Sequence, residues 1–340
     1  MPQLRYLTPF AFLALVPLGG WLGGAWTFSA AAATPLCLVG LDAMLGEERG
    51  PADRIGTPVS RWFPRLYVFL QLGVNAWAAV WVVRPDTGIL EAVGLAVSTG
   101  VTTGVFGFVA AHEMIHSRES GERALGLALL ASVFYMQFRI AHVYGHHRRA
   151  ATFEDPATAR LGEGLYAFVL RSVTGQFREA WTFEAERLRR RGRRAIGARN
   201  RMLLYVAVEA ALIAVVAIFS WRSLLFLIAV ALIAVLLLET FNYIAHYGLV
   251  RGASSDGRVE RLAPEHSWNS GRRMNNAALF NMGRHSHHHR AMTRSYEGLE
   301  PLATASTLPS GYASALLTAF VPPLWRRTMD GRVAAARRSS

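Results

Sequence analysis

Six stretches of the chain are long, apolar and almost free of charged side chains. A membrane-crossing helix needs about 20 mostly apolar residues, and shorter examples occur. Short breaks, "GGA" (23–25), "RPDTG" (84–88) and "WRS" (221–223), join the stretches in pairs, which predicts three tight hairpins. We therefore expect an all-α integral membrane protein, one membrane domain over residues 1–340, with six transmembrane helices. Their expected bounds are about 6–22, 26–41, 66–83, 89–111, 202–220 and 224–243.

The composition agrees with a membrane protein and excludes some kinds of site. Hydrophobic residues make up 52% of the 340-residue chain, and the mean hydropathy of +0.23 is too high for an ordinary soluble domain. The chain has one cysteine, Cys37. A disulfide within the chain and a cysteine-rich zinc or iron–sulfur site are therefore excluded.

The arginines predict the orientation in the membrane. All 36 basic residues are arginine, and the formal net charge is +13. Arg84 and Arg222 lie in two of the tight hairpins, whereas all the others lie in segments on the opposite side of the predicted spans. Positively charged loops stay in the cytoplasm, so we expect a multi-pass protein of the bacterial cytoplasmic (inner) membrane with both termini cytoplasmic. Topology and contact with anionic lipid explain the charge, and we expect no nucleic-acid partner.

The histidines indicate a metal site on the same side. All of them except His266 fall into four groups: "HEMIH" (112–116), "HVYGHH" (142–147), His246, and "HSHHH" (285–289). Residues four apart on a helix share a face, and neutral imidazole is a usual ligand of iron, zinc and copper. We expect these groups to meet in a cytoplasmic, His-rich cap built from segments 112–201 and 244–302.

The first group alone leaves the reaction open. "HEMIH" matches the H-E-x-x-H signature of zinc proteases, but a catalytic zinc takes three protein ligands and would leave most histidines unexplained. Two metal ions with four or five ligands each would use nearly all of them. Zinc is redox-inert, whereas iron can activate O₂, which is the plausible tool against apolar C–H bonds. An intramembrane zinc metalloprotease and a non-catalytic metal- or haem-binding protein are the alternatives.

Several longer blocks resemble one enzyme family. "HEMIH", "HVYGHHRRAATFEDPATARLGEG", "RSVTGQFREAW", "NYIAHYGL", "HSWNS" and "RHSHHHRAMTRSYEGL" are similar, in order, to blocks of the membrane-bound alkane 1-monooxygenases and the related xylene and cymene monooxygenases, within the fatty-acid-desaturase-like superfamily. The resemblance runs from about residue 42 to 302. It implies a non-haem centre of two iron ions held by nine histidines. These are His112, His116, His142, His146, His147, His246, His285, His288 and His289.

The resemblance also implies the reaction. The family hydroxylates a C–H group, typically a terminal methyl, of a lipophilic substrate such as an alkane, using O₂ and electrons passed from NAD(P)H through a reductase and a rubredoxin or ferredoxin. A fatty-acid-type desaturase is the main rival, although its second group usually has two residues before the His-His pair, where this chain has three. Ala141, Ala245 and His287 replace acidic residues that are usual in the family. Such carboxylates orient ligand imidazoles, so their loss predicts altered metal binding or a different substrate.

We expect no catalytic residue beyond the metal ligands, but some residues are expected to support them. Glu239, Asn242 and His246 share a face of the sixth predicted span, and an acid inside a membrane helix is a functional hypothesis by default. Glu239 is therefore predicted to hydrogen-bond a ligand imidazole, with a buried, protonated side chain bonded to a neighbouring backbone as the alternative. Glu113 is a further candidate, with a salt bridge to an arginine as the alternative, and Asp155 is another.

Three expectations concern the surroundings of the site. His287 is expected to be exposed to solvent, and His266 to support the site from beneath. Residues 171–201 combine an apolar stripe with many arginines, which predicts an interfacial amphipathic helix that binds anionic lipid or docks an acidic electron carrier. The substrate is expected to enter from the bilayer, between spans, with its reactive end toward the histidines.

Overall fold

Regular structure in the described part of the chain is helical. The computed structural model describes residues 2–48, 50, 59–252 and 258–339. Within them, pairing of the β type is limited to two isolated bridges, Glu47–Arg272 and Asn269–Thr307. The all-α expectation is therefore confirmed for these residues. Arg49 and Arg54, two of the arginines expected on the cytoplasmic side, lie outside them.

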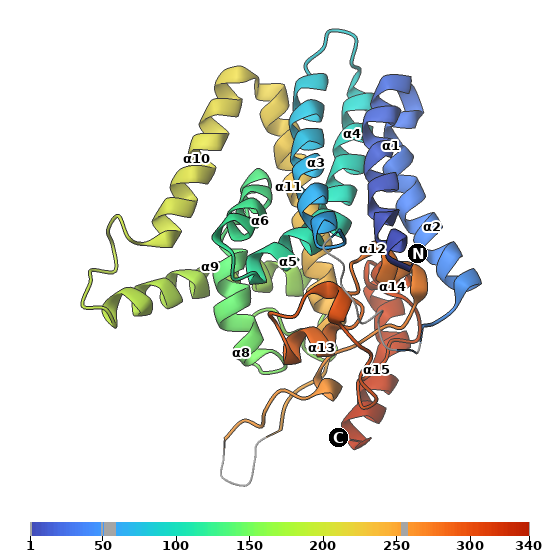
Figure 1. Cartoon of the computed structure of the whole chain (residues 1–340), viewed down its shortest axis with the longest axis vertical. Coiled ribbons are helices and arrows are strands. Elements are labelled where there is room, and N and C mark those ends of the chain that lie inside the picture. Colours follow the sequence, from blue (N-terminus) through green and yellow to red (C-terminus); the bar gives the residue numbers. More distant parts are fainter. Residues whose placement is uncertain (1, 49, 51–58, 253–257, 340) are drawn as a thin grey trace.

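A bundle of long helices forms the upper half of the molecule in Figure 1, and each predicted span overlaps one of them, with ends that differ by a few residues. Gly23 and Gly46, with φ of 74° and 67°, end the first two helices in backbone conformations that favour glycine. The helices of this bundle are α1 (Thr8–Leu22), the 3₁₀ turn Gly24–Phe28 with α2 (Ser29–Leu45), α3 (Trp62–Trp81), α4 (Ile89–Thr102), α10 (Arg201–Phe219) and α11 (Trp221–His246). A π-helical turn, Thr103–Gly107, continues α4 into α5 (Phe108–His116).

Among the described residues, four helical segments are long and apolar enough to cross a membrane, namely Gly24–Leu45, Ile89–His116, Arg201–Phe219 and Trp221–His246. The protein is therefore a helical membrane protein. Polar side chains between α3 and α4 make α3 less apolar: the Gln71 amide donates to Asn75 Oδ1 at 2.8 Å and to Thr103 Oγ1 at 3.0 Å.

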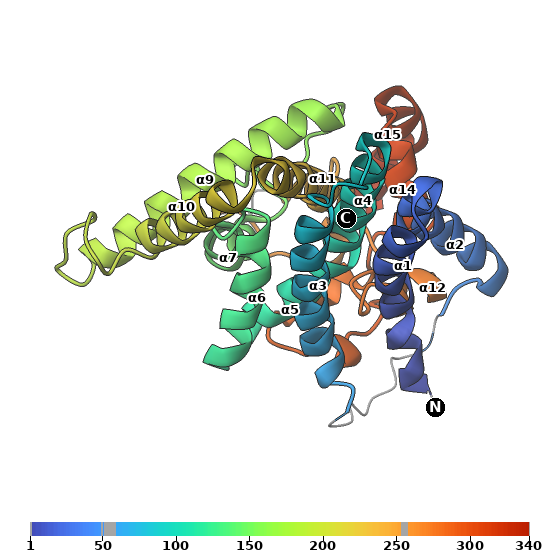
Figure 2. The same ribbon diagram turned by 90° about the horizontal axis from the view of Figure 1, so that it is seen from above.

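Small residues let α4 approach the central helix α11 closely. A Cβ atom on Gly100 would lie 2.7 Å from Ile233 Cβ, and one on Gly104 would lie 2.9 Å from Ala234 Cα. Close backbone approach at small residues is a usual way for membrane helices to associate. By contrast, α10 leans away from the bundle with α9 in both views (Figures 1 and 2). Only 11% of the most apolar 18 residues of α10 are buried inside the protein.

Shorter helices and loops gather at the lower end of the bundle (Figure 1). The predicted amphipathic helix is α9, which starts earlier than expected and ends at Arg189, so the arginine-rich residues after it form a turn into α10. The sequence did not predict α6, α14 or α15. The helices of this layer are α6 (Ser120–Ser132), α7 (Phe138–Ile140), α8 (His147–Arg149), α9 (Leu165–Arg189), α12 (Arg273–Ala278), α13 (His285–Arg290), α14 (Tyr312–Ala319) and α15 (Pro322–Ser339).

Candidate metal centre

The nine histidines expected as ligands come together in two groups, within each of which the ligand nitrogens all lie within 4.8 Å of one another. They reach this place from four separate parts of the chain. We name the groups site A and site B. Site A consists of His112, His116, His142, His147 and His288, and site B consists of His146, His246, His285 and His289.

Local helical geometry aims the rings. His112 and His116 lie one turn apart at the end of α5, and His285, His288 and His289 share a face of the short helix α13. His142 and His146 lie in a π-helical turn, Ala141–His146, that runs into α8, where His147 is the first residue. A π-helical turn changes the register of the side chains that follow, and here the neighbouring His146 and His147 belong to different sites.

The distances in site A are those of nitrogens directed at one ion. His147 Nε2 lies 3.0 Å from His142 Nε2, 3.2 Å from His116 Nε2 and 3.1 Å from His288 Nε2. A neutral imidazole carries a single N–H, so hydrogen bonds cannot explain all three contacts. Two nitrogens bound about 2.1 Å from one ion at right angles are about 3.0 Å apart, which fits the observed spacing.

Site B has the same arrangement. Its Nε2 atoms are 3.2 Å apart between His246 and His285, 3.2 Å between His289 and His246, and 3.1 Å between His289 and His285. His146 Nε2 is buried and has no hydrogen-bond partner among the described residues. The residues present in both sites therefore fit a metal ion.

Burial keeps the rings in the form that binds metal. All nine imidazoles are at most 9% exposed. Burial, and to a lesser degree the neighbouring rings, lowers the pKa of His142, His147 and His288 well below the ordinary value. These side chains are consequently neutral at physiological pH, with a nitrogen lone pair free for a cation.

Asp155 fixes one ring directly. His146 Nδ1 donates to Asp155 Oδ2 at 2.8 Å, which leaves the Nε2 lone pair directed into site B. The same Oδ2 accepts from Thr158 Oγ1 at 2.7 Å, and Oδ1 accepts from Ala157 N at 3.1 Å. A carboxylate behind a ligand imidazole sets its tautomer and raises its basicity. His266 acts more weakly, through its carbonyl oxygen 3.3 Å from His246 Nδ1.

Two expectations about neighbouring residues were wrong. Glu239 accepts from Tyr135 Oη at 2.9 Å, Ser172 Oγ at 2.6 Å and Gln176 Nε2 at 2.9 Å, rather than from an imidazole. Seven residues along a helix correspond to about 10 Å, so Glu239 lies too far up α11 from His246 and instead joins α11 to α9. His287 is 7% exposed rather than solvated, because its Nδ1 accepts from the backbone N–H of Glu300 at 2.7 Å.

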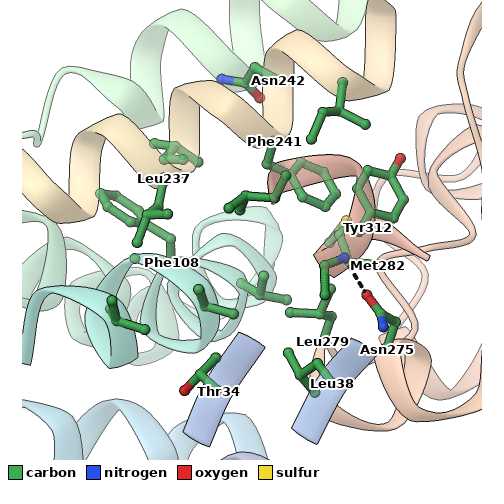
Figure 3. A pocket seen from close by; sticks show the side chains of 18 of the residues that line it. Thr34, Leu38, Phe108, Leu237, Phe241, Asn242, Asn275, Leu279, Met282 and Tyr312 are labelled. Atoms are coloured by element: carbon green, nitrogen blue, oxygen red, sulfur yellow. Dashed lines mark hydrogen bonds between the residues drawn. The ribbon is translucent and has the colours of Figure 1, made fainter. Parts of the chain in front are cut away.

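An apolar cavity of about 210 Å³ ends at the two sites. Its deep end includes His112 and His142 of site A and His285 of site B, and Asn242 also lines it. Figure 3 shows the apolar side chains that surround the space, among them Phe108, Leu237 and Phe241. The residues at the other end are partly exposed. They are Ala31 and Pro35 of α2, Val101 of α4, Val105 of the π-helical turn that follows it, Leu316 and Leu317 of α14, and Phe320 directly after α14.

A second cavity, of about 250 Å³, is polar and reaches site A from another direction. His116 and Glu113 line it, and Glu113 Oε1 accepts from the backbone N–H of Tyr296 at 3.1 Å. Arg61, Arg65, Arg118 and Arg294 also line it. The imidazoles therefore adjoin an apolar space and a polar, arginine-rich one.

Helices suited to a bilayer above two buried sets of imidazoles define a histidine-rich integral membrane metalloprotein. Comparison with known proteins makes the class more specific. Residues 90–316 match the fatty acid desaturase family. The chain is 40% identical over 266 residues to alkane 1-monooxygenase 1 of Pseudomonas aeruginosa, covering 78% of this chain and 70% of that protein.

Other relatives agree. Alkane 1-monooxygenase 2 of Alcanivorax borkumensis is 33% identical over 307 residues, covering 87% of this chain and 79% of that protein. The xylene/toluene monooxygenase hydroxylase component of Pseudomonas putida is 32% identical over 336 residues, with coverages of 96% and 87%. The chain belongs to the alkane 1-monooxygenase family, and it is an enzyme.

Proposed function

We propose that this protein is a non-haem di-iron monooxygenase that hydroxylates a C–H group, with a terminal methyl as the expected position, of a lipophilic substrate such as an alkane. One observation carries the proposal: rings from both sites line the deep end of an apolar cavity. The names of the relatives, alkane and xylene/toluene monooxygenases, support the same chemistry and substrate class.

Two iron ions are assigned because the imidazoles divide into sets of five and four. The five residues of site A would hold one ion and the four of site B the other. What iron supplies when bound is activation of O₂, which no side chain provides; one oxygen atom enters the product and the other leaves as water.

The chain's own residues bind and orient the substrate. Apolar side chains exclude water from the cavity and offer a hydrocarbon no polar group to displace, which favours burial of an alkyl chain. The partly exposed end of the cavity lies among residues of α2, α4 and α14, where a molecule dissolved in the bilayer would enter. A substrate extended from there would place its far end against His112, His142 and His285.

We further propose six spans in a single membrane domain, with α1 and α3 joining the four segments that are long and apolar enough to cross. Support comes from the position of α1 and α3 beside α2 and α4 in both views (Figures 1 and 2). The arginines on the metal-site side support a bacterial cytoplasmic membrane location with both termini cytoplasmic.

The electron donor proposed is a rubredoxin or ferredoxin reduced by an NAD(P)H-dependent reductase. An acidic carrier suits the arginine-rich surface, and Arg61, Arg65, Arg118 and Arg294 line the polar cavity that ends at His116. Acidic-to-neutral changes on the carrier should then slow electron transfer to this protein, more strongly at low ionic strength.

Product analysis tests the function. Cells expressing the chain with a reductase and carrier are fed alkanes, alkylbenzenes, fatty acids and terpenoids under ¹⁸O₂. Gain of one labelled oxygen supports the proposal, whereas loss of two hydrogens indicates a desaturase. One zinc without iron, with peptide cleavage, would indicate the protease.

Two adjacent histidines provide a matched test of the ligands. His288 belongs to site A, whereas His287 is bonded to the backbone at Glu300. We expect His288→Ala to lose iron at one site and all turnover, and His287→Ala to keep its iron. Full activity in His288→Ala would refute the ligand assignment.

A further inference from the structure

The C-terminal helix α15 packs against the end of α11, although it lies beyond the residues that match the family model, which end at 316. Its buried face consists of Trp325, Met329 and Val333, spaced four residues apart and at most 1% exposed. The Trp325 ring lies 5.6 Å from the ring of Tyr243 and 5.5 Å from that of Tyr247. The helix is therefore held against the last turn of α11, which carries His246.

Two residues of α15 form hydrogen bonds with the residues that follow His246. Tyr247 Oη donates to Asp330 Oδ1 at 2.7 Å. The carbonyl oxygen of Gly248 accepts from Arg337 Nε at 2.9 Å and Nη2 at 2.6 Å. The approach is close, because a Cβ on Gly248 (φ 69°) would lie 2.9 Å from Val333.

The same turn is tied from its other side to the loop that carries Trp268. The Trp268 backbone N–H donates to Ala245 O at 2.8 Å, and its indole N–H donates to Tyr247 O at 2.9 Å. The contact of His246 Nδ1 with the carbonyl of His266 is long, at 3.3 Å. The direction of the His246 ring therefore depends mainly on how the backbone on either side of it is held.

We propose that α15 is a clasp that positions His246 for site B, with Asp330 and Arg337 as positioning residues. The proposal rests on the proposed function, since it requires that site B hold a metal ion. Loosening the clasp should lower the metal affinity of site B and leave that of site A unchanged. Every ring of site A comes from α5, the 142–147 segment or α13, and none comes from α11.

The test uses the full-length protein in lipid nanodiscs. The variants are Asp330→Ala and Arg337→Ala, with Asp330→Asn as the conservative change that keeps an acceptor oxygen for Tyr247. Arg327→Ala removes a charge from an exposed position of the same helix and is the matched control. Iron per chain is measured during titration with a chelator, ferric EPR spectra are recorded, and thermal unfolding of the metal-free protein reports on the fold.

Loss of a supporting contact typically costs about 10–100-fold in metal affinity, and we expect about tenfold for site B in both alanine variants. They should release one of two irons early and show the EPR signal of an uncoupled ferric ion, while Asp330→Asn and Arg327→Ala behave like the unmodified protein. If both irons leave together, or neither leaves early, the clasp is refuted. If the unmodified protein binds no iron, the proposed function itself fails.

Discussion

Replacement of Asp155 by asparagine is the sharpest test of how site B is held. The change keeps the shape of a side chain that is 1% exposed but removes its charge. His146 Nδ1 then loses an anionic partner at 2.8 Å. We expect the variant to fold and to bind iron more weakly in site B.

The magnitude follows from the contacts of the carboxylate. Two donors, His146 Nδ1 and Thr158 Oγ1, meet at Oδ2, and the N–H of Ala157 meets Oδ1. The asparagine oxygen best replaces Oδ2, so its NH₂ group faces the Ala157 N–H, which costs about 1–3 kcal/mol of stability as an unsatisfied buried donor. Removing the carboxylate behind a ligand imidazole lowers metal affinity about 10–100-fold, or about 1.4–2.7 kcal/mol.

The assay is chelator competition on the purified protein, with iron counted per chain. Glu184→Gln is the matched control, because Glu184 is also a fully buried acid but bonds Arg187 and Arg201 rather than an imidazole. It should lose stability and keep its iron. Unchanged iron affinity in Asp155→Asn would refute the role assigned to the carboxylate.

Three further predictions concern stability and substrate size. Although burial opposes ionisation, hydrogen bonds from Arg187 and Arg201 lower the pKa of Glu184 to about 2. Because this pKa lies below the value in the unfolded chain, the ionised carboxylate stabilises the folded protein above about pH 4.5, and this contribution is lost as the pH falls toward 2. Glu184→Gln should therefore cost about 3 kcal/mol at pH 7 and progressively less below pH 4.5 in calorimetry. Glu239→Gln keeps an oxygen for Tyr135 and Gln176 but places an NH₂ group against the Ser172 hydroxyl that donated to the carboxylate. It should cost about 1–3 kcal/mol of stability without changing iron content, and an iron loss would restore the role expected from the sequence. Ala31→Phe narrows the partly exposed end of the apolar cavity and should lower kcat/KM for bulky substrates more than for slender ones; equal losses across the panel would argue against entry there.

Features encoded by the local spacing of residues were predictable from the sequence, whereas features that depend on contacts between distant segments were not. Continuous apolar runs indicated the long helices, and spacings of three and four indicated which histidines share a face. Glu239 and His246 share a face of α11, but at a helical rise of about 1.5 Å per residue their separation of seven residues puts the ring out of reach of the carboxylate. Burial of His287 depends on the backbone at Glu300, which no local pattern encodes. The apolar spacing of Trp325, Met329 and Val333 in α15, by contrast, was a readable signal of a packed helix.

The H-E-x-x-H motif has a different meaning here from its meaning in a zinc protease. A catalytic zinc is held by three protein ligands and keeps an open position, whereas His112 and His116 join three more imidazoles in site A. Glu113, the base in a protease, accepts from the backbone at Tyr296. A peptide would also need polar partners for its backbone, and the cavity that ends at His112 is lined largely by apolar side chains. Two residues four apart thus fix only the direction of two rings, while the number of other ligands and the polarity of the adjoining cavity decide which chemistry the rings can support.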